Sequence, residues 1–455
     1  MQNIKFTGYS LLFTALFIES VFLFLLAPRY YQYEFNLFCM FQYLVSSFLF
    51  LRAKKKQNYF DFDMIFMFTF FFVMFFYPVF MFESDPTKYF AFKYEFNENV
   101  ISRATALSLL GMQAYFLGSL TYMQKDRENK KVVSQKQDGI TSLSIISLGT
   151  FVLFIFFGGY AKLAGEYSGQ EVEASGVAAY LYVFFPVFLL CAIAFQFNKF
   201  FSFDKEKLQF KKINKMLLLC FLLILGMLII AGSRTIPLQL VLVCGGLFTM
   251  FYKQISFIKF LPLVIIGVLL MFAVNVMRGG GTGGVSELAD VVMDLIICNR
   301  NTYMAVDYVD VNGITYGKSM LSPVLSSIPF LQNIVFTLFS INPSDAGSAV
   351  FFTKLTLGEG SSLGLGTNII ADLYLSFGMF GVMFCMFLLG RYISKFIFLA
   401  KKNIYALVFY SVMMSYSVFI VRAEFFYFIR YLVWCLFTVF LMKLLQNSTK
   451  YLDKY

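Results

Sequence analysis

The chain has 455 residues, of which 59% are hydrophobic, 20% aromatic and only 14% charged. Soluble domains carry about a quarter charged residues, so this composition excludes an ordinary soluble protein and indicates a polytopic membrane protein. The formal net charge of +11 does not require a nucleic acid partner, because basic residues of membrane proteins gather in cytoplasmic loops. The absence of histidine removes the commonest general base and metal ligand.

Apolar runs close to the length that crosses a bilayer, about 20 residues, recur about twelve times along the chain. They predict an all-α integral membrane protein with one polytopic domain over residues 1–455. The expected spans are 9–26, 35–51, 64–82, 101–122, 143–157, 177–195, 216–231, 236–251, 260–276, 368–389, 404–421 and 431–445. The seven cysteines mostly fall inside these runs without paired spacing, so we interpret them as small hydrophobic residues.

Residues 277–367, between the ninth and tenth runs, are too polar and glycine-rich to lie in lipid. With both termini inside, the cytoplasmic loops hold about 25 of the 37 lysines and arginines. This asymmetry favours an even number of spans. It places the long segment outside the cytoplasm, as one large loop.

The large loop begins with Arg278 and the glycine-rich run 279–284. The run lacks the Gly-Lys-Ser/Thr ending of a phosphate loop, so a mobile lid and a plain linker both remain open. The pattern from 285 to 310 is acidic and helical and fits an amphipathic helix on the membrane surface, with Arg300 within it. Further along, prolines argue against one long helix, and the run 331–341 is too short to cross the membrane.

Two short turns between spans carry charged residues. Arg234 lies in the hairpin 231–235, where it either reaches lipid headgroups or faces a ligand that the small neighbouring residues allow to approach. Arg422 and Glu424, two residues apart in the turn before the last span, can face one cavity. Asp372, about one turn inside the tenth span, is costly there unless it is paired or hydrated.

These features coincide in order with those of a known family. The chain resembles the Wzy-type polymerases of O-antigen and related surface polysaccharides, including enterobacterial common antigen polymerases. The resemblance rests on the Gly-Ser-Arg-Thr hairpin, Arg278 at the end of the ninth run, the large loop, the Gly-Leu-Gly-Thr-Asn sequence before Asp372 and the Arg422-Ala423-Glu424 turn. The resemblance covers the chain from Tyr160 onward, whereas the first four spans match only in hydropathy.

The resemblance implies a protein of the bacterial inner membrane with a GT-C-like polymerase or ligase architecture, whose large loop 277–367 is periplasmic. It also implies a glycosyltransferase that moves a glycan from undecaprenyl pyrophosphate to the next lipid-linked repeat unit at the periplasmic face. It implies catalytic roles for Arg234, Arg278, Arg422 and Glu424. Further substrate contacts are expected from Arg300, Tyr316, Lys318, Glu359, Asp372, Tyr427 and Arg430. The expected partners are lipid-linked oligosaccharides, membrane lipid and a chain-length regulator protein, and this chemistry requires no metal or other cofactor.

Two other functions fit the same outline. An O-antigen ligase has a similar large loop but relies on a histidine that this chain lacks. A lipid-linked oligosaccharide flippase would line a path with charges, and Glu19 inside the first span suits a proton-coupled role. The simpler interpretation is that Glu19 bonds a neighbouring helix. The sugar, the linkage and the stereochemical outcome are not encoded in these motifs.

Overall fold

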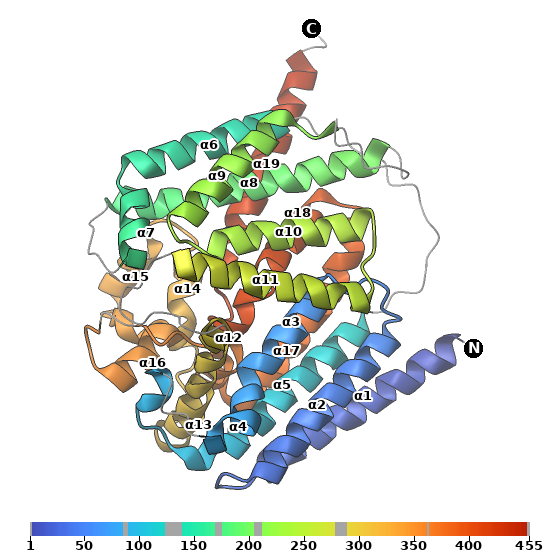
Figure 1. The fold of residues 1–455 in the computed structure, drawn as a ribbon, viewed down its shortest axis with the longest axis vertical. Coiled ribbons are helices and arrows are strands. Elements are labelled where there is room, and N and C mark those ends of the chain that lie inside the picture. The colour runs from blue at the N-terminus through green and yellow to red at the C-terminus, as the bar shows by residue number, and fades with distance from the viewer. Residues whose placement is uncertain are drawn as a thin grey trace.

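The fold is entirely helical in the part of the chain that the structure describes, and no strand occurs there (Figure 1). The computed structural model describes residues 2–84, 90–122, 139–168, 175–203, 212–277, 289–361 and 364–452. Within these ranges six helices are long and apolar enough to cross a membrane, or seven if the bent pair α6 and α7 forms one span. The prediction of an all-α protein with many apolar spans is confirmed at this level.

Every expected apolar run coincides with a helix, although two runs are divided. The six long helices are α1 (Gln2–Leu25), α2 (Tyr33–Ala53), α5 (Ile101–Thr121), α8 (Gly176–Phe203), α17 (Ile369–Ala400) and α19 (Ile429–Leu452). The other apolar helices are α3 (Phe62–Met74), α4 (Phe76–Phe80), α6 (Ile140–Phe156), α7 (Gly159–Ser168), α9 (Lys215–Ile230), α10 (Thr235–Phe251), α11 (Phe257–Met277) and α18 (Ile404–Ser415). A turn separates α3 from α4, and another separates α18 from the 3₁₀ helix η9 (Phe419–Arg422).

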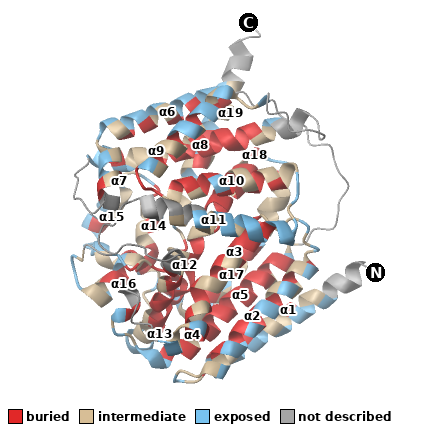
Figure 2. Cartoon of the chain, viewed as in Figure 1, coloured by how far each residue is buried: buried red, intermediate tan, exposed pale blue. Residues whose placement is uncertain are grey.

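Helices α5 and α17 form the centre of one half of the bundle. Helix α5 is buried along almost its whole length, with α1, α2 and α17 packed around it (Figure 2). A Cβ added to Gly118 would lie 1.9 Å from the Phe387 carbonyl oxygen, and one added to Gly390 would lie 2.1 Å from that of Tyr115. These two glycines therefore let the backbones of α5 and α17 touch, as small residues do in membrane helix pairs.

Helix α17 is broken near its start at Gly378, whose φ of 66° and ψ of −158° lie in a region essentially reserved for glycine. The break leaves the carbonyl groups of Leu375 and Ser376 without helical partners. The Thr315 N–H donates to the Leu375 oxygen at 2.9 Å, and the Gly317 N–H donates to the Ser376 oxygen at 3.2 Å. The segment before α14 thus completes the hydrogen bonding of the broken helix.

The polar segment between α11 and α17 folds into short helices that gather at one end of the bundle (Figure 1). They are α12 (Ala289–Ile296), α13 (Arg300–Asn312), α14 (Leu321–Leu325), α15 (Leu331–Leu338) and α16 (Ser348–Leu357). The expected helix over 285–310 corresponds to α12 and α13, and α15 has eight residues, too few to cross a bilayer. Arg278 and the glycine-rich run 279–284 lie outside the described residues.

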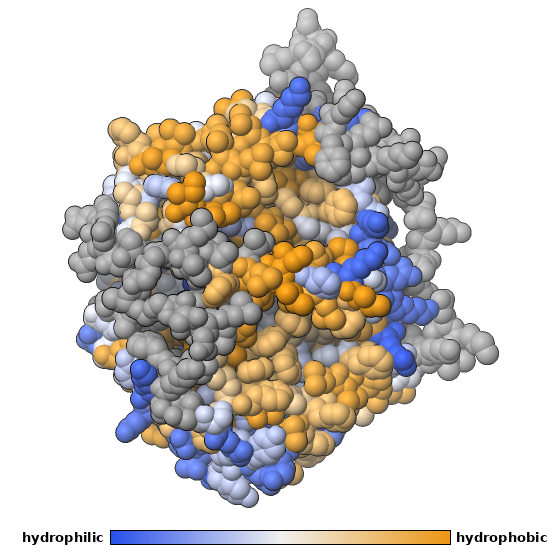
Figure 3. Space-filling model, in the orientation of Figure 1, coloured by the Kyte–Doolittle hydropathy of each residue, from blue (hydrophilic) through white to orange (hydrophobic). Residues whose placement is uncertain are grey.

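Glu19 makes the helix contact that the simpler interpretation expects. Its Oε2 accepts a hydrogen bond of 3.0 Å from Nε2 of Gln42, which joins α1 to α2. On the surface, apolar side chains spread over α10 and α11 and the neighbouring helices, and hydrophilic side chains gather toward the edges of the view (Figure 3). This distribution agrees with a belt of helices that faces lipid.

Replacing Gly378 with alanine is expected to destabilise the protein by about 1–3 kcal/mol, because a Cβ makes the observed φ and ψ unfavourable. The thermal unfolding midpoint of the purified protein in detergent measures this loss. Gly226→Ala in α9 is the matched control, since a Cβ there meets no atom within 4 Å. Equal midpoints for the two variants would contradict the importance of the break.

Candidate functional site

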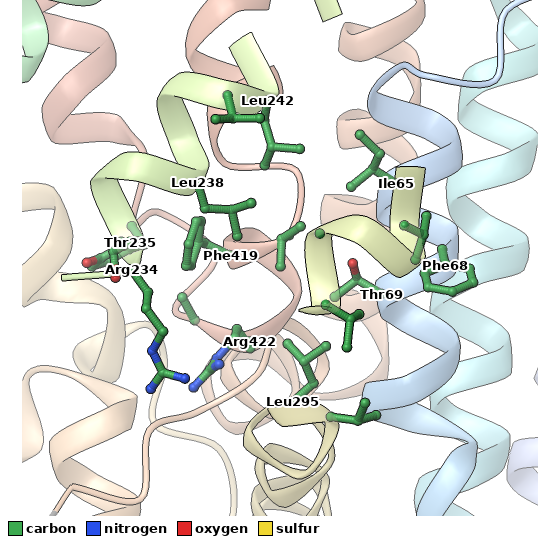
Figure 4. A pocket seen from close by; sticks show the side chains of 18 of the residues that line it. Ile65, Phe68, Thr69, Arg234, Thr235, Leu238, Leu242, Leu295, Phe419 and Arg422 are labelled. Carbon is green, nitrogen blue, oxygen red and sulfur yellow. The ribbon is translucent and has the colours of Figure 1, made fainter. Parts of the chain in front are cut away.

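A cavity of about 550 Å³ lies between α3, α10, α11, α12 and the loop that precedes α19. Arg234, Arg422, Glu424 and Tyr427 line it, together with the backbone region at Gly366 and Thr367. The structure therefore brings together four residues that sequence reasoning took from two turns almost two hundred positions apart. Figure 4 shows the side chains of Arg234 and Arg422 reaching toward one another at one end of the cavity.

The position of Arg234 follows from how α9 ends. The Gly232 N–H donates to the Ile229 oxygen and the Ser233 N–H to the Leu228 oxygen, both at 2.9 Å, while Gly232 has a φ of 82°. This is a Schellman motif, in which glycine takes the left-handed conformation that closes a helix. The chain reverses at once, so Arg234 is the residue immediately before α10.

Arg422 ends η9, and a buried carboxylate fixes the loop that follows. Ala423 is extended, and the Phe425 N–H then donates to Oδ2 of Asp372 at 2.8 Å. Asp372 is fully buried near the start of α17 and is absent from the residues that line the cavity. The structure thus places Asp372 behind the loop of Arg422 and Glu424, where it positions that loop.

Apart from Thr69, Thr235 and Thr367, the remaining walls of the cavity are mostly apolar. Leu238 and Leu242 of α10 lie across the cavity from Ile65 and Phe68 of α3, above the two arginines in Figure 4. Leu242 lies eight positions after Arg234, so the apolar wall extends about 12 Å along α10 at 1.5 Å per residue. A ligand that fits must carry a negative group at one end and a long apolar group at the other.

Glu424 lies at the N-terminus of α16. Its Oε1 accepts the Ala349 N–H at 3.4 Å, and a Cβ added to Gly347 would lie only 2.8 Å from the same oxygen. Burial raises the pKa of Glu424 above the usual glutamate range, while the backbone N–H groups of Ala349 and Ser348 oppose the rise. A carboxyl group whose pKa is shifted toward neutral is suited to accept a proton.

Sequence reasoning missed the asparagines that hold the cavity wall. The Asn368 side chain accepts the Ala371 N–H at 2.9 Å, which caps α17, and donates to the Cys298 oxygen at 2.6 Å. The Asn301 amide donates to the carbonyl oxygens of Leu365 and Gly366 at 3.1 and 3.2 Å. An asparagine directly before an apolar run is a recognisable N-cap signal, but nothing in the sequence pairs it with residue 298.

Arg300 is buried away from the cavity. Its Nη1 donates to Oγ1 of Thr356 and its Nη2 to the carbonyl oxygen of Glu95, both at 2.9 Å, and its guanidinium lies 5.7 Å from the centre of the Phe96 ring. Burial lowers the pKa of Arg300 to about 10. The residue joins α13 to α16 and to the segment before α5.

Three other candidates lie outside this cavity. Lys318 pairs with Asp345 at 3.0 Å, and Glu359 pairs with Lys354 at 2.8 Å. Tyr316 is 84% exposed. None of the three is among the residues that line the cavity, whereas Arg430 lines a second cavity that adjoins it. Arg278 lies outside the described residues.

The described residues contain no group of three or more cysteine, aspartate and glutamate side chains that could hold a metal ion. The chemical groups in the cavity are two guanidiniums, a carboxyl group and a phenol, beside a long apolar wall. Guanidiniums bind phosphate oxygens in bidentate fashion and keep their charge. The arrangement can therefore hold a phosphorylated lipid and place its head group near a proton acceptor.

Comparison with known proteins agrees with this chemistry. The chain matches the family described as O-antigen polysaccharide polymerase Wzy over residues 9–452, which extends the likeness to the N-terminal helices as well. No curated protein and no solved structure matches the chain. The family match spans nearly the whole chain, and the apolar helices make it a multi-pass membrane protein. The chain belongs to the O-antigen polysaccharide polymerase Wzy family and is a repeat-unit polymerase of the glycosyltransferase type.

Proposed function

We propose that this protein polymerises lipid-linked oligosaccharide repeat units by moving the growing glycan from undecaprenyl pyrophosphate onto an incoming lipid-linked unit. The observation that carries the proposal is that Arg234, Arg422 and Glu424 line one cavity with a long apolar wall. A polyprenyl chain fits the wall, and the pyrophosphate fits the two guanidiniums. No other part of the donor would need to enter the membrane.

The leaving group explains the need for arginine. As the bond between the sugar and pyrophosphate breaks, negative charge gathers on the pyrophosphate oxygens. Arg234 and Arg422, held by a hairpin and by η9, stabilise that charge from fixed positions, so little reorganisation is needed during the reaction. The two guanidiniums repel each other, and binding of the pyrophosphate anion relieves this repulsion. Arg278 is proposed as a third contact to the pyrophosphate.

Glu424 is proposed as the general base. The attacking group is a sugar hydroxyl, which becomes a better nucleophile as a carboxylate takes its proton. The carboxyl group of Glu424 is held at the start of α16 and has a pKa raised by burial, so it holds the transferred proton better than an exposed glutamate does. Asp372 contributes by holding the loop through the Phe425 N–H.

The proposal includes a topology. Both termini and the basic loops lie in the cytoplasm, twelve helical segments cross the inner membrane, and the segment 277–367 belongs to the periplasmic side. The architecture is proposed to be GT-C-like, with a chain-length regulator protein as partner. Deletion of this protein then leaves single repeat units attached to the surface lipid. Loss of a ligase instead leaves no repeat units attached, and loss of a flippase leaves the units on the cytoplasmic leaflet.

Arg234→Lys and Arg422→Lys are each expected to lower the polymerisation rate about a hundredfold, because lysine keeps the charge but loses the bidentate geometry. The rate is measured with purified protein and undecaprenyl pyrophosphate-linked repeat units, at equal protein amounts. Arg391→Lys, an exposed arginine on α17, is the control and should retain the original rate. Full activity of both cavity variants would refute the pyrophosphate contact.

Glu424→Gln is expected to abolish polymerisation while leaving the thermal unfolding midpoint nearly unchanged. In the unmodified protein the base works only when deprotonated, so the rate should fall as the pH drops through the pKa of Glu424. Because burial raises that pKa, the rate should fall at a pH above about 4.3, which is the ordinary pKa of glutamate. A Glu424→Gln variant with full activity would remove the base from the mechanism.

Gly347→Ala is expected to displace the Glu424 carboxylate and lower the rate about tenfold or more, equivalent to about 1.4 kcal/mol in the barrier. Gly347 has an extended backbone that alanine also adopts, so the effect should come from the 2.8 Å contact with Oε1 and not from backbone strain. The control is Gly364→Ala, where a Cβ meets no atom within 4 Å. A rate loss shared equally by both variants would count against the positioning of Glu424.

A further inference from the structure

A second cavity of about 690 Å³ adjoins the first, and the two share part of their lining. Glu424 and Tyr427 line both cavities. The two side chains therefore form a wall with a cavity on each side. A group bound in the second cavity and a group bound in the first can therefore both lie beside Glu424 and Tyr427.

The lining of the second cavity differs in chemistry from that of the first. It contains hydroxyl groups of Ser322 and Ser326, the amide of Gln332, the cationic side chains of Lys162 and Arg430, and the phenols of Tyr182 and Tyr431. Helices α3, α10 and α11, which form the apolar wall of the first cavity, contribute none of its lining residues. Apolar residues such as Phe154, Leu163 and Val183 also line the second cavity, but its hydroxyl, amide and aromatic groups suit a hydroxyl-rich ligand.

Helices from distant parts of the sequence build the second cavity, at the edge of the molecule where α7, α14 and α15 gather (Figure 1). The Arg430 guanidinium lies 6.0 Å from the centre of the Tyr180 ring, and the Tyr180 ring lies 5.7 Å from that of Phe330. These contacts join the starts of α19, α8 and α15. The buried Tyr416 ring packs against Tyr427 and Tyr431 at 5.7 and 5.5 Å, so the aromatic wall has a fixed support.

The contact between α14 and the Glu424 region fixes the wall from the other side. The Ser322 N–H donates to the Ala346 oxygen at 2.7 Å, directly before Gly347. A Cβ added to Gly347 would lie 2.8 Å from Oε1 of Glu424 and 3.6 Å from Cβ of Ser322. The carboxyl group is thus held close to a residue that lines the second cavity, within reach of a hydroxyl bound there.

We propose that the second cavity binds the acceptor glycan, the terminal sugar of the incoming repeat unit, and presents its hydroxyl to Glu424. This inference rests on the proposed function, in which the first cavity holds the donor pyrophosphate. The acceptor hydroxyl oxygen forms the new bond to the anomeric carbon of the donor sugar, and its proton passes to the Glu424 carboxylate. The bond from that carbon to the pyrophosphate oxygen breaks, and the pyrophosphate leaves with the electron pair.

Binding of two separate probes tests the assignment. One probe is undecaprenyl pyrophosphate, and the other is the repeat-unit oligosaccharide released by mild acid from the lipid-linked pool of cells that lack this protein. Gln332→Trp fills the second cavity from α15 and should weaken oligosaccharide binding roughly tenfold while changing undecaprenyl pyrophosphate binding less than about twofold. Arg422→Lys should show the opposite pattern. Asn333→Trp, at the exposed neighbouring position on α15, should change neither.

The possible outcomes separate this inference from the proposed function. The acceptor site alone would be overturned if the original protein forms polymer and either of two results is found. In the first, Gln332→Trp leaves oligosaccharide binding unaffected; in the second, Arg422→Lys weakens that binding as much as Gln332→Trp does. Failure of the original protein to bind undecaprenyl pyrophosphate and to form polymer would remove the proposed function, and the acceptor site with it. If Gln332→Trp lowers the thermal unfolding midpoint, Ser326→Leu, directly after α14, provides a second filling variant with the same expected pattern.

Discussion

The buried bond between the Asp372 carboxylate and the Phe425 N–H, 2.8 Å long, joins the start of α17 to the loop that carries Arg422 and Glu424. A charged or polar group in such a buried position is costly unless it has a partner, so the bond constrains both elements at once. Because α17 also packs along the whole of α5, the loop is fixed to the most buried part of the bundle. The cavity lined by the two arginines therefore rests on the rigid core.

The break at Gly378 serves the same arrangement. A continuous α17 would leave no free carbonyl groups for the segment that contains Thr315 and Gly317, and that segment would lose its attachment to the bundle. With the break, the short helices α14 to α16 are held over the start of α17, and α16 presents its first N–H groups to Glu424. A backbone conformation that only glycine adopts without strain thus attaches the short helices α14 to α16 to the apolar bundle.

Two cavities that share one wall suit a reaction between two large substrates. The apolar wall and guanidiniums of the first cavity fit a lipid pyrophosphate, and the polar groups of the second fit a glycan. In the proposed mechanism the reacting atoms meet beside Glu424, so neither substrate needs to pass through the site of the other. In the same proposal, separate sites allow a growing chain and a new unit to bind independently.

The sequence by itself determined the class of protein and the positions of its helices. Apolar runs long enough to satisfy a bilayer have few alternatives to helix, and prolines and glycines mark where the helices end. It also determined which charges are unusual, because Arg234, Arg422 and Glu424 stand in turns too short to move far. It did not indicate that Asp372 and Arg300 are buried and do not line the cavity of the two arginines.

Only the tertiary structure decided which turns meet. The contacts of Asn368 with residue 298, of Gly347 with Glu424 and of Asp372 with Phe425 join segments from 53 to 77 positions apart, and local patterns do not encode such pairings. The division of the site into two cavities likewise depends on packing among α7, α8, α14, α15 and α19. The physical reason is that periodicity and propensity act over a few turns of helix, whereas burial and hydrogen bonding between distant segments depend on the whole fold.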